Sequence, residues 1–170
     1  GWLLADRLGG IKNYREYSAD FSSAGQPSRE RFELLKSQGF ERVVYIAFAN
    51  SEGAISDEDQ LVRELGMHYA QVRVIWDAPT KADFDTFAAV MQSAPEKKTL
   101  LHCQANYRAS AFSFLYRVLY EGVPMATAKK DLDSVWTPNQ TWRELIFTVA
   151  STPSSFRKGT SDLRSSNVLR

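Results

Sequence analysis

Apolar residues in the middle of the chain follow two different periods in turn, and this alternation constrains the fold most strongly. Three short apolar runs with β-branched or aromatic residues are typical of strands, at 41–48, 67–76 and 98–103. Helical segments closed by Gly or Pro lie at 28–38, 57–65 and 81–93. The order predicts βαβ units, and therefore an α/β fold with a mostly parallel central sheet flanked by helices.

Three further helices are expected after the last strand, at 107–120, 125–134 and 139–150. Residues 151–170 are rich in Ser, Gly and charge, which is typical of a polar tail. A length of 170 residues fits one domain. We therefore expect a single domain over residues 11–150 and a polar tail over 151–170.

Composition excludes several classes of protein and site. The single cysteine allows no intrachain disulfide, and with only two histidines it cannot complete a closed Cys/His zinc site. The net charge of +1, from 21 basic and 20 acidic residues, does not favour nucleic acid or an anionic membrane as a partner. No apolar stretch has the length of a membrane span. We expect a soluble protein, cytoplasmic or exported.

The segment His-Cys-Gln-Ala-Asn-Tyr-Arg-Ala-Ser, residues 102–110, joins the last strand to a helix. A thiol that faces a helix N-terminus lies in the positive field of unpaired N–H groups, which favours the thiolate. The same N–H groups can hold a tetrahedral oxyanion, and the Arg108 guanidinium adds a two-pronged clamp. The segment therefore predicts a nucleophile and an anion site in one loop, at the carboxyl edge of the sheet.

This segment resembles the signature of cysteine-dependent protein tyrosine and dual-specificity phosphatases, which reads His-Cys, five residues, Arg and then Ser or Thr. The matching residues are His102, Cys103, Arg108 and Ser110. Together with Ser-Ala-Gly-Gln-Pro at 23–27, the segment resembles more closely a bacterial phosphatase-like family named for a beta-lactamase-hydrolase-like domain. The resemblance covers residues 11–145 and implies a phosphatase-like fold for the domain.

The resemblance implies a phosphomonoester hydrolase that acts through a cysteinyl-phosphate, without metal or organic cofactor. Cys103 would be the nucleophile and Arg108 the phosphate clamp, while His102 orients the loop and the Ser110 hydroxyl helps to expel the thiolate. The backbone that would line the phosphate site runs through Gln104, Ala105, Asn106, Tyr107 and Arg108. The implied partner is a phosphorylated substrate, either a phosphoprotein or a small phosphoester, or free phosphate.

Two departures from the usual signature leave alternatives open. Only four residues separate Cys103 from Arg108, and Asn106 stands where the loop usually has glycine. Asn tolerates a left-handed backbone better than other non-glycine residues. Four intervening residues are the spacing of rhodanese loops, so a sulfurtransferase is one alternative. A non-catalytic phosphate-binding module is the other.

A phosphatase also needs a general acid for the leaving oxygen. Asp77, in Trp-Asp-Ala-Pro, follows the strand predicted before the cysteine strand, and its position resembles that of the acid loop of tyrosine phosphatases. Asp83 and Asp85 are competitors. Thr80 and Asp83 have the spacing of a capping box, which favours a structural role for Asp83.

The acidic cluster at residues 57–59 favours a structural interpretation. Ser56 precedes it and is predicted to be the N-cap of a helix whose acidic first turn matches the helix dipole.

Overall fold

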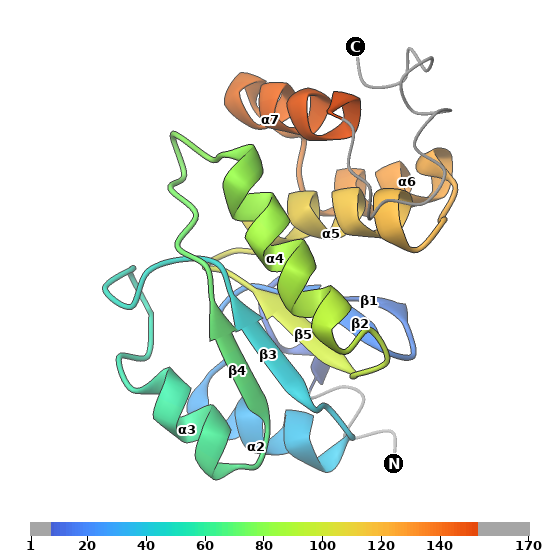
Figure 1. Cartoon of the computed structure of the whole chain (residues 1–170). Coiled ribbons are helices and arrows are strands. Elements are labelled where there is room, and N and C mark those ends of the chain that lie inside the picture. Colours follow the sequence, from blue (N-terminus) through green and yellow to red (C-terminus); the bar gives the residue numbers. More distant parts are fainter. Residues whose placement is uncertain (1–7, 153–170) are drawn as a thin grey trace.

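The computed structural model describes residues 8–152. Within this range the strands are β1 (Arg15–Ser18), β2 (Phe21–Ala24), β3 (Arg42–Tyr45), β4 (His68–Gln71) and β5 (Thr99–His102). The helices are α2 (Arg29–Ser37), α3 (Glu58–Glu64), α4 (Lys81–Ser93), α5 (Tyr107–Tyr120), α6 (Met125–Val135) and α7 (Gln140–Ser151) (Figure 1). The expected α/β class is confirmed.

The strands form one sheet in the order β1-β2-β5-β3-β4, antiparallel only between β1 and β2. The other pairs are parallel, so the carboxyl ends of four strands meet at one edge. In this register His102 lies level with Ala24 on one side and with Tyr45 on the other. The loop after β5 is therefore flanked by the ends of β2 and β3.

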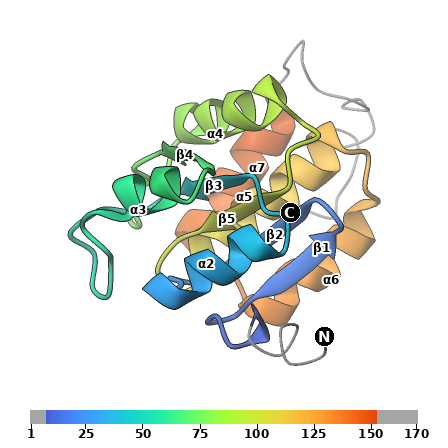
Figure 2. The ribbon, with the colours of Figure 1, turned by 90° about the horizontal axis from the view of Figure 1, so that it is seen from below.

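Helices cover both faces of the sheet, as expected for parallel strands. Neighbouring strand residues point to opposite sides: Val43 and Leu100 belong to the core under α2 and α3, whereas Val44 and Leu101 belong to the core under α4 and α5. Helices α6 and α7 pack outside α5 (Figure 2). Because α5 is enclosed by the sheet and by these helices, almost all of its residues are buried.

The hairpin β1–β2 has no counterpart among the predicted elements. Both strands are four residues long, and β2 carries two serines in place of strand-forming residues. Ser22 and Ser23 are nevertheless buried, because their hydroxyls hydrogen-bond to those of Tyr14 and Tyr17 at 3.0 and 2.5 Å. A hydrophobicity pattern would predict that both serines are exposed, but these hydrogen bonds allow their hydroxyls to be buried.

The strand predicted at 67–76 is only partly correct, because β4 ends at Gln71. Val72 and Val74 are buried, yet the backbone leaves the sheet there and runs to the start of α4 as an irregular segment. The expected polar tail lies outside the described residues from 153 onward. No helix within residues 8–152 is long and apolar enough to span a membrane.

Candidate active site

Cys103 lies at the junction of β5 and α5, as the sequence predicts. Its backbone N–H donates to the carbonyl oxygen of Ala24 at 3.2 Å, and the residue is 1% exposed. Four residues later α5 begins at Tyr107, and its first N–H groups have no acceptor within the helix. We call residues 103–108 the cysteine loop.

The outer side of the cysteine loop is held by two neighbouring segments. The carbonyl oxygen of Gln104 accepts from the N–H of Gln26 at 3.1 Å, and that of Ala105 accepts from Nδ2 of Asn13 at 2.9 Å. In a trans peptide the N–H points opposite to the carbonyl. The N–H of Ala105 therefore points away from Gln26, in a direction where it can serve an anion.

Asn106 has a left-handed backbone, with φ +70° and ψ +5°, as expected for the residue in the glycine position. Its side chain does not cap α5. Instead, Nδ2 donates to the carbonyl oxygen of Asn13 at 2.7 Å. The Asn13 side chain in turn donates to the carbonyl oxygen of Ala105, so two hydrogen bonds join Asn13 to the cysteine loop.

Arg108 lies in the first turn of α5 and is 8% exposed. Nη1 donates to the carbonyl oxygen of Val74 at 3.2 Å, and the guanidinium carbon lies 5.8 Å from the centre of the Trp76 ring. The segment that follows β4 therefore packs directly on Arg108.

Ser110 is buried behind the loop, and its hydroxyl has two partners. It donates to the carbonyl oxygen of Tyr107 at 3.0 Å and accepts from Nε1 of Trp136 at 3.1 Å. The Tyr107 ring, 39% exposed, stacks on Trp136 with 4.8 Å between centroids. Trp76 joins this pair, with its centroid 5.4 Å from that of Trp136, so aromatic rings form one wall beside Arg108.

Asp77 is exposed in a turn directly after Trp76. Trp142 of α7 anchors this turn, because its Nε1 donates to the carbonyl oxygen of Trp76 at 3.0 Å. The two competing carboxylates have structural partners. Asp83 completes the predicted capping box with Thr80, and Asp85 forms an ion pair with Lys81.

His102 leads to a functional candidate that sequence reasoning missed. Its Nε2 lies 2.6 Å from Oε2 of Glu58, and both residues are buried. The predicted Ser56 N-cap is wrong, because the N-cap is Asp57. The next residue, Glu58, turns inward to His102. No local signal marks it, because 44 residues separate the partners and only the fold joins them.

The surroundings of Glu58 favour its ionised form. Burial alone raises the pKa of Glu58, but the charge of His102 and hydrogen bonds from His102, Gln26 and Tyr69 outweigh burial, so the pKa lies below its ordinary value. Burial and the Glu58 charge together raise the pKa of Tyr69. The ring of Tyr45 stacks on His102 with 4.6 Å between centroids.

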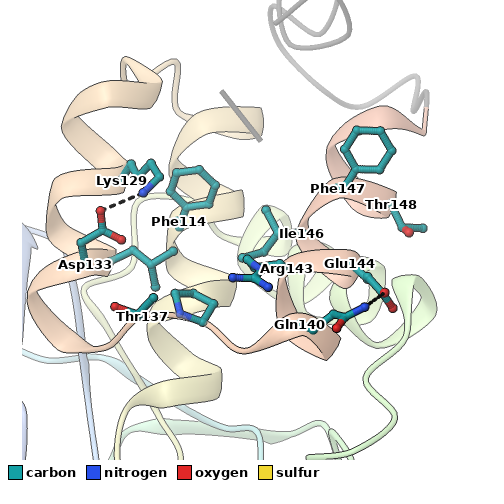
Figure 3. A pocket seen from close by; sticks show the side chains of 12 residues that line it. Phe114, Lys129, Asp133, Thr137, Gln140, Arg143, Glu144, Ile146, Phe147 and Thr148 are labelled. Atoms are coloured by element: carbon teal, nitrogen blue, oxygen red, sulfur yellow. Dashed lines mark hydrogen bonds and ion pairs between the residues drawn. The ribbon is translucent and has the colours of Figure 1, made fainter. Parts of the chain in front are cut away.

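Two hollows lie near this part of the molecule. A cavity of about 690 Å³ borders the cysteine loop at Gln104 and is also lined by Lys12, Gln26 and Arg29. A larger one, about 940 Å³, lies between α5, α6 and α7 (Figure 3). Its apolar floor includes Phe114 and Ile146, and it does not include the cysteine loop.

Neither a scan of protein-family models nor a search of curated proteins returns a match. Solved structures do match. A DUF442 phosphatase-like protein of Shewanella putrefaciens CN-32 is 34% identical, with a TM-score of 0.77, over 86% of this chain and 96% of the Shewanella chain.

More distant structures share the fold. Pseudomonas aeruginosa TpbA is 16% identical, with a TM-score of 0.65, over 90% of this chain and 89% of its own. The catalytic domain of the PP-IP phosphatase SIW14 of Saccharomyces cerevisiae is 11% identical, with a TM-score of 0.65, over 80% of this chain and 84% of its own. Both have the fold of cysteine-dependent tyrosine and dual-specificity phosphatases.

Proposed function

Because this chain belongs to the DUF442 family of phosphatase-like proteins, we propose that it hydrolyses phosphomonoesters through a cysteinyl-phosphate. One observation carries the proposal. Cys103 stands between the end of β5 and the N-terminus of α5, and Arg108 follows in the first turn of that helix. A thiol, a helix N-terminus and a guanidinium around a single short loop support the proposal.

In the first step the Cys103 thiolate attacks phosphorus in line with the leaving oxygen. The S–P bond forms as the bond from phosphorus to that oxygen breaks, and the oxygen keeps the electron pair and takes a proton from Asp77. In the second step water attacks phosphorus, Asp77 accepts its proton, and the thiolate leaves with the S–P electrons. Loop N–H groups and Arg108 stabilise the transferring group, which is the main catalytic task in phosphoryl transfer.

Ligands of the structural relatives agree with an anionic substrate. One TpbA structure holds phosphotyrosine, and the SIW14 structure holds citrate. The phosphate site proposed here comprises the backbone of Gln104, Ala105, Asn106 and Tyr107 together with Arg108, with His102 and Ser110 as supporting residues. The proposed domain spans residues 11–150.

We expect the wild-type protein to hydrolyse an aryl phosphate and to be inhibited by orthovanadate. Cys103→Ser should abolish turnover, and Arg108→Ala should lower kcat by about 10³-fold or more. Asp77→Asn should lower kcat by about 10²- to 10⁴-fold. Asp59→Asn, a change at an exposed carboxylate paired with Arg63, is the control and should leave kcat unchanged.

Steady-state assays measure kcat for each variant, and circular dichroism checks that each variant is folded. A wild-type protein without vanadate-sensitive turnover on any aryl phosphate would overturn the proposal.

The four-residue spacing between Cys103 and Arg108 supports a second candidate, sulfur transfer by a persulfide on Cys103. Formation of thiocyanate from thiosulfate and cyanide, without phosphatase activity, would establish it. Phosphate that raises the melting temperature without turnover of either substrate would instead indicate a non-catalytic phosphate-binding module.

A further inference from the structure

The ring of His102 lies between two oxygen atoms. Nε2 is 2.6 Å from the Glu58 carboxylate, and Nδ1 is 3.3 Å from the carbonyl oxygen of Cys103. A carbonyl oxygen and an ionised carboxylate only accept hydrogen bonds, so each ring nitrogen needs a proton. The geometry therefore calls for a doubly protonated imidazolium.

Both oxygens of Glu58 have partners. Oε2 contacts His102, and Oε1 accepts from Nε2 of Gln26 at 2.7 Å. The Glu58 side chain is 3% exposed and that of His102 is fully buried. Buried ion pairs contribute little net stability compared with apolar residues of the same volume. Stability is thus a weak reason for an ion pair at this place, directly behind the nucleophile.

The pair is connected to the cysteine loop at two points. Gln26 donates to Glu58 with its side chain and to the Gln104 carbonyl with its backbone N–H. His102 contacts the Cys103 carbonyl, which shares a peptide with the N–H of Gln104. Because the two groups of a trans peptide point in opposite directions, this contact turns the Gln104 N–H away from His102.

Resting on the proposed function, we propose that Glu58 is a positioning residue that acts through His102. It keeps the imidazole ring doubly protonated and held against the Cys103 carbonyl. The ring then sets the direction of the first peptide after the nucleophile. The other titratable groups that face the pair are Tyr45 on β3 and Tyr69 on β4.

The test replaces the carboxylate by an amide of the same shape, Glu58→Gln. The amide oxygen can still accept a hydrogen bond from Nε2 of His102. Without the negative charge, however, the His102 ring keeps only one proton. One ring nitrogen then faces an oxygen atom without a hydrogen between them. We expect kcat on an aryl phosphate to fall by about 10- to 100-fold, with little change in KM, because the loop is misplaced relative to phosphorus. Asp59→Asn on the same helix is the matched control.

Nitrogen-15 NMR of the histidine rings gives a readout that a purely structural role would not move. The chain has two histidines, and His68 is exposed and serves as the internal reference. At about pH 7 we expect protons on both nitrogens of His102 in the wild type and in Asp59→Asn, but on one nitrogen in Glu58→Gln.

A singly protonated His102 in the wild type would overturn the proposal, and so would a Glu58→Gln variant with wild-type kcat. The wild-type spectrum decides even if the variant does not fold. It also decides if the wild type has no phosphatase activity, so failure of the proposed function and failure of this inference are distinguishable.

Discussion

Asn106 shows how one residue combines a backbone and a side-chain role. Its left-handed φ needs glycine or a residue such as asparagine, and its Nδ2 gives the loop a hydrogen bond that glycine cannot supply. The arrangement has a cost, because Oδ1 is buried and has no hydrogen-bond partner among the described residues. Such a cost persists mainly at functional sites.

Gly25 is required for a different reason, the close approach of two backbones. A Cβ at this position would lie 2.8 Å from the carbonyl oxygen of Gln104 and 3.1 Å from Lys12. Because a backbone carbonyl cannot yield like a side chain, we expect Gly25→Ala to lower the free energy of unfolding by about 1–3 kcal/mol. The displaced cysteine loop should also lower kcat.

Thermal unfolding and aryl phosphate hydrolysis measure both effects of Gly25→Ala. Gly9→Ala is the control, since a Cβ at Gly9 would have no neighbour within 4 Å. Equal melting temperatures and kcat values for the two variants would contradict the expected clash.

At the scale of elements, the site depends on segments that lie beside the cysteine loop without belonging to it. Trp142 of α7 holds the carbonyl of Trp76, and so anchors the turn that carries Asp77. On the other side of the cysteine loop lies Asn13, which precedes β1. Its side chain donates a hydrogen bond to the Ala105 carbonyl, and its own carbonyl accepts one from the Asn106 side chain.

We expect Asn13→Gly to release the cysteine loop without straining the backbone. Glycine accepts the φ of +52° at this position, but the hydrogen bond to the partly buried Ala105 carbonyl is lost. The lost bond is worth about 1 kcal/mol, and the misplaced loop should lower kcat by about tenfold. Asn50→Gly, in an exposed turn, is the matched control. If kcat of Asn13→Gly equals that of the control, the hydrogen bond from Asn13 to Ala105 is not needed to position the loop.

At the scale of the whole molecule, stability should depend on pH through Glu58. Its pKa in the folded chain lies below the ordinary value of 4.5, so the unfolded chain takes up the proton first as the pH falls. The stability that this carboxylate contributes is complete above the ordinary value. This contribution is lost as the pH falls through the lowered pKa that Glu58 has in the folded chain.

Melting temperatures of the wild type and Glu58→Gln, from neutral pH to about pH 3, test this dependence. We expect a difference between the two proteins that shrinks as the pH falls below the ordinary glutamate pKa of 4.5. A difference that stays constant over the whole range would mean that Glu58 does not contribute as an anion.

Sequence patterns alone predict the parallel core, the loop between β5 and α5, the capping box of Thr80 and Asp83, and the left-handed backbone of Asn106. These features have local causes: the period of apolar residues, capping groups and the backbone freedom of asparagine. The functional roles of Cys103, Arg108 and Asp77 remain predictions.

Tertiary contacts, by contrast, determine the β1–β2 hairpin, the hydrogen bonds of Asn13 to the cysteine loop and the inward turn of Glu58. Ser22 and Ser23 enter the core because tyrosine hydroxyls meet them there, and Glu58 is buried because His102 lies opposite. A polar side chain is buried only where a partner satisfies it. Since these partners lie elsewhere in the chain or on an unpredicted hairpin, no local pattern contains them.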